Sequence, residues 1–542
     1  MSLDTMKTKS FLRQNSIVIF LLFISLFTIS SYIQSQNTKH YWWTSDSAFY
    51  IEAARNHHKT AELIVSSDTL SETETEIVSL WPPGYPILLS IIHQFVPLDI
   101  SWISLTLSVF SWMILPVCIY LFSKQIIEET TSFYLAIMVL SSPAAFWVGY
   151  VGLTDMPFLI TVLIGFVLCR DLDSTENSVF VKTLLSGLLI GFSFTIRNAG
   201  AAALLSVFFS YIFYFLISKQ QRKIIFKKLI VWSIGTSIFV LPLLLYNLKT
   251  FGKLQPYSMP PSTVSLLSNI RGYIHATFFE MFGSHELAIL IGWDFLGLLS
   301  LSVIALSACL YYLFIYFDST ITRLKKILKE FIIPTNNAFT LTNIIFYSIF
   351  GIVIVIYART KYEWGESINL RHVLQYNWAI LIVAISLFLR LLKEHHAKIA
   401  IYVLCSLVVF GHFNYYLITY YNASETKNIK MTLKRQTYFN EALKNEIIQQ
   451  TGNKVYIGSN FHDVLRIATG EMIHPYCDSK KELAESLKEN LPKIQKLLKN
   501  KNQKGIIYIF SDPEKVDEIK NIKIPGITVQ RQNDYLFKFH II

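Results

Sequence analysis

The chain has 542 residues, of which 52% are hydrophobic and 15% aromatic, while only 16% are charged. Its mean hydropathy of +0.42 lies well outside the ordinary range of soluble proteins, so a purely soluble enzyme is excluded and a membrane protein is indicated. The apolar runs reach the roughly 20 residues that a helix needs to cross a bilayer, and they do not alternate as barrel strands would.

The first apolar run covers residues 16–33 and follows Lys7, Lys9 and Arg13. We interpret it as a membrane anchor, because it is longer than a usual signal core and no small-residue cleavage site follows it. The aromatic triplet 41-YWW-43 after it is typical of a membrane interface.

The remaining apolar runs predict ten more spans, which makes the expected fold class an α-helical polytopic membrane protein with about eleven transmembrane helices and a small C-terminal α/β domain. The stretch 86–96 is too short to cross and predicts a helix lying at the interface. The ten spans are expected at residues 101–122, 132–150, 154–169, 182–196, 199–217, 229–247, 287–316, 338–357, 373–389 and 399–420.

Basic residues set the predicted orientation. Residues 218–228 contain five lysines and arginines and residues 323–330 contain four, so both loops should be cytoplasmic, with the N-terminus. This topology explains the formal net charge of +11 better than nucleic-acid binding does, and we expect no nucleic-acid partner. The alternation of spans then places the loops at 34–100, around 152, around 198, 248–286 and 358–372 on the extracytoplasmic face.

Two domains are predicted: a transmembrane domain over residues 1–420, whose first outer loop (34–100) is interfacial, and an extracytoplasmic α/β domain over residues 421–542. In the second, strand-like 454–458 and 505–510 bracket a helix-like 480–499, and 527–539 resembles a terminal hairpin. Four of the five cysteines lie in apolar runs, so no disulfide framework is implied.

Soluble-enzyme motifs are missing: the sequence has no Walker loop, no dinucleotide-binding glycine fingerprint, no paired CxxC and no HExxH. The polar candidates lie instead at the outer ends of spans. Asp46 follows the first span, and Asp155 lies in a short turn between two spans. Each alone is more often a loop charge or a helix N-terminal acid, but two carboxylates facing the same compartment favour a site.

An ordered set of short motifs resembles the C-type (GT-C) membrane glycosyltransferase superfamily, and more narrowly the bacterial branch similar to protein O-mannosyltransferases and the lipid A aminoarabinose transferase. The set covers most of residues 10–390. It consists of Asp46 with Tyr50, 81-WPPGYPILLS-90, 153-LTDMPF-158, 195-TIRNAG-200 and 371-RHVLQYNW-378.

The resemblance implies an enzyme of the cell envelope, in the plasma (inner) membrane, that transfers a hexosyl or pentosyl group from a polyprenyl-phosphate donor to a lipid, glycan or protein acceptor. By position, Asp46 matches the first-loop acid of the family and Asp155 the second. Family members often have two adjacent acids in the first loop, whereas Ser47 follows Asp46 here. The resemblance implies no definite cofactor, and it leaves open whether the enzyme uses a divalent metal.

Inverting transfer needs a base that takes the proton of the acceptor hydroxyl as this oxygen attacks the anomeric carbon. Asp46 is the candidate base, and Asp155 either orients the acceptor or shares that role. The leaving phosphate needs cations, for which Arg197 and Arg371 are the candidates, with snorkelling as the alternative for each. Weaker candidates for substrate contacts are Tyr50, Arg55, Tyr85, Lys361 and Tyr362.

Two other classes fit a multi-span protein with polar residues at one face. A lipid-linked saccharide transporter or flippase should place ionisable residues near mid-membrane, whereas here they lie at span ends. An O-antigen ligase or polymerase is the second alternative, and the acidic first loop argues against it. The sugar and the acceptor are set by pocket shape, which no motif names.

Overall fold

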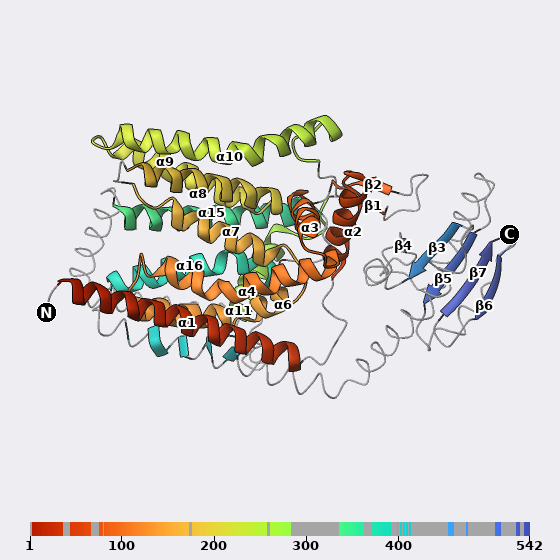
Figure 1. The fold of residues 1–542 in the computed structure, drawn as a ribbon, viewed down its shortest axis with the longest axis horizontal. Helices are drawn as coiled ribbons and strands as arrows, with labels where there is room; N and C mark the ends of the chain where they lie inside the picture. Colours follow the sequence, from red (N-terminus) through yellow and green to blue (C-terminus); the bar gives the residue numbers. More distant parts are fainter. Residues whose placement is uncertain are drawn as a thin grey trace.

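The chain folds mainly into helices that run side by side along one axis (Figure 1). The computed structural model describes residues 3–35, 44–66, 75–79, 81–172, 176–256, 261–282, 335–362, 368 and 370–391, parts of 398–412, and five strands between 454 and 541. The helices of the bundle are α1 (Leu3–Ser35), α4 (Ile100–Ser123), α5 (Glu129–Leu140), α6 (Pro143–Gly149), α7 (Asp155–Leu168), α8 (Asn177–Ile196), α9 (Gly200–Ile217), α10 (Arg222–Phe251), α11 (Leu266–Phe282), α15 (Asn336–Lys361) and α16 (Leu370–Leu391).

Six of the described helices are long and apolar enough to cross a membrane, namely α4, α8, α9, α10, α15 and α16. The pair α5 and α6 passes the same test together, and α1 and α7 contain shorter apolar stretches. The multi-span helical fold class is therefore confirmed among the described residues. The total of eleven spans stays a prediction, because residues 283–334 and 413–420 lie outside the described residues.

Two predicted spans differ in shape from the expectation. The expected single span at 132–150 is the bent pair α5 and α6, whose axes meet at 55°. The break follows from Ser142, which caps α6 by accepting from the amide of Ala145, and from Pro143, which has no amide hydrogen to continue α5. α10 begins at Arg222 and not near residue 229, so it continues well into the basic loop.

The helices α2 (Ser45–Thr60) and α3 (Gly84–Phe95) lie across one end of the bundle (Figure 1). α3 confirms the short helix expected at 86–96. Its first residue, Gly84, approaches α8 so closely that a Cβ there would lie 2.5 Å from the carbonyl oxygen of Thr195. The two short strands β1 (Ile64–Ser66) and β2 (Thr75–Ile77) pair antiparallel between α2 and α3 in the chain.

The C-terminal strands form one mixed sheet in the order β4-β3-β5-β7-β6. The predicted strands at 454–458 and 505–510 are β3 (Lys454–Ser459) and β5 (Gly505–Phe510), which pair parallel. The predicted hairpin is β6 (Ile527–Arg531) and β7 (Leu536–Ile541), which pair antiparallel, and β4 is Ile473–His474. The helix expected at 480–499 lies outside the described residues, so the α/β domain and its boundary stay predictions.

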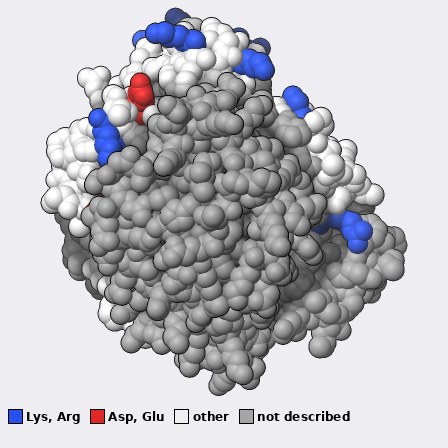
Figure 2. Space-filling view, turned by 90° about the vertical axis from the view of Figure 1, so that its right-hand side faces the viewer, with Lys and Arg blue, Asp and Glu red and all other residues white. Residues whose placement is uncertain are grey.

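The basic side chains of the described residues are partly visible from one end of the molecule (Figure 2). Viewed from the right-hand side of Figure 1, the Lys and Arg side chains of the described residues are spread around the visible surface (Figure 2).

Candidate active site

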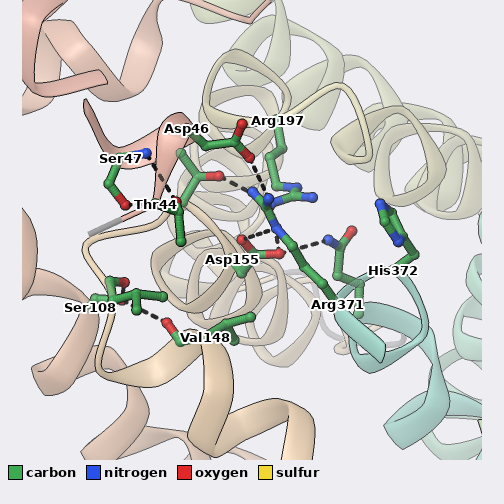
Figure 3. A network of polar contacts seen from close by, with 12 residues as sticks. Thr44, Asp46, Ser47, Ser108, Val148, Asp155, Arg197, Arg371 and His372 are labelled. Atoms are coloured by element: carbon green, nitrogen blue, oxygen red, sulfur yellow. Dashed lines mark hydrogen bonds and ion pairs between the residues drawn. The ribbon is translucent and has the colours of Figure 1, made fainter. Parts of the chain in front are cut away.

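Four charged side chains from distant parts of the chain meet between α2, α7, α8 and α16 (Figure 3). Arg371 contacts both carboxylates: its Nη1 donates to Asp46 Oδ2, and its Nε lies 2.9 Å from Asp155 Oδ2. Arg197 Nη1 lies 2.7 Å from Asp155 Oδ1. The structure thus brings together both candidate acids and both candidate phosphate-binding arginines in one ion-pair network.

α2 carries Asp46 in its first turn. Thr44 caps the helix by accepting from the amide of Ser47 at 3.2 Å, and the partial positive charge of the helix N-terminus favours an acid there. The next turn presents Tyr50, which is buried against Trp81 and Tyr85 with ring centroids 6.2 and 5.3 Å away. Burial, helped by Asp46, raises the pKa of Tyr50, so its hydroxyl remains protonated.

Asp155 is the first residue of α7, directly after the tight turn that ends α6. Two serines of α4 hold this turn: Ser104 Oγ donates to the carbonyl of Gly152 at 3.0 Å, and Ser108 Oγ donates to the carbonyl of Val151 at 3.1 Å. These bonds satisfy carbonyls that a broken helix leaves without intrahelical partners. The turn that aims Asp155 at the arginines is therefore fixed from the neighbouring helix.

Arg197 lies in the short connection between α8 and α9. Its backbone is extended, and its side chain also donates to Thr154 Oγ1 at 3.2 Å. α9 can begin directly after this short connection because Gly200 has no side chain: a Cβ there would lie 2.6 Å from the backbone of Phe194. On α16, Gln375 is one turn after Arg371 and donates from Nε2 to Asp155 Oδ1 at 3.2 Å.

The network borders a cavity of about 940 Å³, within the range typical of small-molecule sites. The two carboxylates differ in their access to it. The side chain of Asp155 is 0% exposed and that of Asp46 is 18% exposed. Asp46 lines the cavity, whereas Asp155 lies behind the two arginines. Asp46 is thus placed to meet a substrate, and Asp155 is placed to hold the guanidinium groups.

The other candidate contacts divide into two groups. Tyr50, Lys361 and Tyr362 line the cavity. Tyr85 and Arg55 are not among the described lining residues: the hydroxyl of Tyr85 lies 3.1 Å from Ser104 Oγ inside the core, and Arg55 binds the N-cap residue of α4, Asp99, at 2.9 Å. Both are therefore placed to stabilise the packing of α2 and α3 on α4.

Several lining residues were not singled out from the sequence. Gln375 and Tyr376 are almost fully buried, and Gln375 Oε1 and the Tyr376 hydroxyl have no hydrogen-bond partner within the described structure. Both fall in the motif 371–378, and helical spacing from Arg371 points to Gln375. Arg359 and His372 also line the cavity; His372 falls in the same motif, whereas Arg359 lies outside the short motifs quoted from the sequence.

The described residues do not fit a carboxylate-bound metal. No group of three or more His, Cys, Asp or Glu side chains among them is arranged to hold an ion. Asp46 is the single carboxylate among the described lining residues, and the Arg371 guanidinium bound to it would repel a divalent cation.

The chain was compared with known proteins. No profile of a known protein family and no curated protein matches it. Among solved structures, ArnT from Cupriavidus metallidurans bound to undecaprenyl phosphate matches with a TM-score of 0.52 at 11% identity, covering 99% of this chain and 98% of that chain. The Archaeoglobus fulgidus oligosaccharyltransferase in complex with zinc and sulfate gives 0.53 at 13% identity, covering 92% and 68%.

Both of these proteins belong to the GT-C superfamily, so the resemblance expected from the short motifs is confirmed at the level of fold. At such low sequence identity the similarity shows a shared fold and nothing about the reaction. The chemistry must be argued from the residues of this cavity.

Proposed function

We propose that the protein is an integral membrane glycosyltransferase that transfers a sugar from a polyprenyl-phosphate donor to an acceptor hydroxyl, with inversion and with Asp46 as the general base. The observation that carries the proposal is the cavity itself. One accessible carboxylate, two fixed arginines and an apolar wall border the same space, which is what a lipid-linked sugar phosphate and an attacking hydroxyl require.

The phosphate of the donor fits the arginine pair. As the bond between the anomeric carbon and the phosphate oxygen breaks, the phosphate leaves with the bonding electrons, and charge grows on its oxygens. The side chains of Arg197 and Arg371 are 15% and 13% exposed, so each guanidinium group still reaches the cavity while Asp155 holds it in place. Guanidinium groups fixed in advance stabilise such charge without reorganising during the reaction.

Asp46 suits the role of base. Arg371 contacts its Oδ2, and Figure 3 shows the other carboxylate oxygen directed away from Arg371. In the proposed step the acceptor oxygen attacks the anomeric carbon from the side opposite the phosphate, and its proton passes to Asp46. Asp155 is too deeply buried for this step and acts by orienting the arginines.

The apolar wall supports a lipid-linked donor. Leu243 and Leu244 of α10 and Ile354 and Val355 of α15 line the cavity, whereas Leu245 on the next face of α10 is 64% exposed. An isoprenoid chain would therefore find apolar side chains of α10 both in the cavity and on the exposed face of the helix. In keeping with this, the ArnT structure that shares the fold is bound to undecaprenyl phosphate.

The sugar has polar partners at the inner end of the cavity. Gln375 Oε1 and the Tyr376 hydroxyl, which lack partners in the described structure, are placed to bond sugar hydroxyls. A buried polar atom without a hydrogen-bond partner lowers the stability of the free protein, and a ligand that supplies the missing partner regains that free energy on binding. Trp81 and Trp147 add aromatic surface to the same cavity.

The charge distribution along α10 supports an extracytoplasmic site. The helix begins in the basic segment 218–228, which should be cytoplasmic, and Asn247 near its other end lines the cavity. A helix of 30 residues spans about 45 Å, enough to cross the bilayer between these points. The same reasoning places the first outer loop, with α2 and α3, on the side of the cavity.

The test uses membranes that contain the wild type, Asp46→Asn or Glu62→Gln, the last being an exposed acid that does not line the cavity. Transfer from labelled polyprenyl-phosphate sugars and binding of the donor are measured together. Asp46→Asn should lose about 10²- to 10⁴-fold in transfer while still binding the donor, and Glu62→Gln should match the wild type. Full transfer by Asp46→Asn would remove the proposed base, and donor translocation without transfer would favour a flippase.

A further inference from the structure

A buried acid on α11 contacts the start of α6. Glu280 is 6% exposed, and both of its carboxylate oxygens accept hydrogen bonds from α6 and its cap. Oε1 accepts from the hydroxyl of Ser142, and Oε2 accepts from the amide of Ala144 at 2.9 Å. This amide belongs to the first turn of α6, whose amides have no intrahelical acceptor. Glu280 therefore caps α6 from another helix, and no described residue of α11 lines the cavity.

The capped end of α6 is the point where the span bends. α5 and α6 meet at 55°, and side chains from two other parts of the chain contact this break. His412 Nε2 donates to the backbone carbonyl of Glu280 at 2.6 Å, and His412 Nδ1 lies 2.9 Å from Ser141 Oγ. The bend is thus held by contacts from α11 and from His412, in addition to the cap that Ser142 provides.

The position of α6 matters for the ion-pair network. Trp147 of α6 lines the cavity, and α6 ends at Gly149, six residues before Asp155. Gly149 packs so closely on α4 that a Cβ there would lie 2.5 Å from the ring of Trp112. Because α6 has seven residues and is only about 10 Å long, a shift at its start is passed on to the turn before Asp155.

α11 also contacts the helix that carries Arg371. Thr277, about one turn before Glu280, donates to Asn377 Oδ1 of α16 at 3.3 Å. Glu280 and Asn377 line the same small internal cavity, so the two contacts are neighbours. α11 therefore joins α6, which leads to Asp155, to α16, which carries Arg371.

We propose that Glu280 is a positioning residue, whose carboxylate holds α6 and thereby fixes the turn that aims Asp155 at Arg197 and Arg371. The inference deepens the proposed function and rests on it for its kinetic readout. The two guanidinium groups stabilise the leaving phosphate best when they are held in place, and a displacement of about 1 Å can cost a hundredfold in rate. Binding of the lipid phosphate is less sensitive to such a displacement, because the charge on the phosphate oxygens grows only during the reaction.

The experiment uses the full-length protein in nanodiscs as wild type, Glu280→Ala, Glu280→Gln and Lys228→Met. Glutamine keeps both contacts without the charge, since its Oε1 accepts from the amide of Ala144 while its Nε2 donates to Ser142 Oγ. Alanine removes both contacts.

Lys228 provides the matched control. Its side chain is buried, and its ammonium donates to the carbonyls of Asp171 and Leu172, just after the other end of α7. Lys228 does not line the cavity. Lys228→Met therefore removes a buried charged contact at a helix end without touching α6.

The kinetics of sugar transfer separate positioning from stability. Both Glu280→Ala and Lys228→Met should melt below the wild type, because each leaves buried polar groups unpaired. Only Glu280→Ala should lose kcat, by roughly ten- to hundredfold, while its KM for the donor stays within about threefold of the wild type. Glu280→Gln should keep kcat within about threefold, because its hydrogen bonds to α6 remain.

Hydrogen exchange of the amides in residues 143–158, followed by mass spectrometry, is a readout that needs no sugar transfer. Glu280→Ala should speed exchange in this segment, whereas Glu280→Gln and Lys228→Met should leave it as in the wild type. If Glu280→Ala does not fold, Ser142→Ala takes its place. It removes one of the two donors to the carboxylate and should lower kcat by about three- to tenfold.

The positioning role is refuted if Glu280→Ala, or Ser142→Ala in its place, keeps the kcat of the wild type. It is refuted equally if Glu280→Gln or Lys228→Met loses as much kcat as Glu280→Ala, or if hydrogen exchange in residues 143–158 is unchanged. These results leave the proposed function standing, because the wild type still transfers sugar. Absence of transfer by the wild type would instead count against the proposed function, and hydrogen exchange would then still test whether Glu280 holds α6.

Discussion

Replacing Asp155 with asparagine should destabilise the protein far more than replacing Asp46. Asp155 is fully buried and holds Arg197 at 2.7 Å, Arg371 at 2.9 Å and Gln375 at 3.2 Å. Removing one partner from a buried ion pair costs about 3–5 kcal/mol, because the charge left behind is uncompensated. Asp46 is 18% exposed and, among the described residues, pairs with Arg371 alone, so its loss should cost about 1 kcal/mol.

The assay is an unfolding titration and a melting curve of the detergent-purified variants, run beside sugar transfer. The difference of at least about 2 kcal/mol between the two variants corresponds to roughly 30-fold in the folded-to-unfolded ratio. A double variant, Asp155→Asn with Arg197→Gln, restores the charge balance and should regain part of the stability without regaining transfer. If Asp155→Asn melts like the wild type, or the double variant is no more stable than the single one, the counter-ion role of Asp155 is wrong.

Three further changes have defined outcomes. Gly84→Ala should lower the melting temperature, at a cost of about 1–3 kcal/mol, because its Cβ would lie 2.5 Å from the carbonyl oxygen of Thr195; an unchanged melting curve would contradict this close approach. Tyr376→Phe removes a hydroxyl without a described partner, so stability should hold while the affinity for the donor sugar falls roughly tenfold in a binding titration; equal affinity would argue against a sugar contact. Partial burial raises the pKa of Asp99, but hydrogen bonds from Ser101 and Arg55 outweigh it and leave the pKa below the usual range. Ionised Asp99 therefore stabilises the fold above about pH 4, and this stabilisation is lost as the pH falls through the lowered pKa of Asp99. Asp99→Asn should be less stable than the wild type at pH 7 by at most about 1 kcal/mol and equally stable in acid. A stability difference that stays constant across pH would refute this linkage.

The sequence predicted the positions of the charged residues well, because a charge at the end of an apolar run is conspicuous. Asp46, Asp155, Arg197 and Arg371 were each expected at one face of the membrane, and the structure brings them into one network. Lengths of apolar runs likewise predicted α4, α9 and α15 to within a few residues. These features depend on local composition, which a single sequence displays directly.

The pairing of these charges was not predictable. Arg371 contacts residues 216 and 325 positions away in the chain, and periodicity carries no information at such separations. The sequence therefore predicted a phosphate partner for Arg371, which stays a prediction, and it gave no sign that Arg371 would also pair with two carboxylates. The break between α5 and α6 was missed for a different reason: the span was placed by hydropathy alone, whereas 141-SSP-143 carries the serine N-cap and the proline that begin α6.

The position of Arg371 between the two acids has a consequence for the order of binding. Asp155 and Asp46 fix the guanidinium during folding, so its conformational entropy is already lost when the donor arrives. A phosphate at Arg371 competes with Asp46 for the same cation. Donor binding would therefore release a carboxylate oxygen at the moment when an acceptor proton must be taken, whereas in the resting protein Arg371 occupies that oxygen. On this reasoning both carboxylate oxygens of Asp46 become available only in the donor complex, which favours donor binding before productive binding of the acceptor.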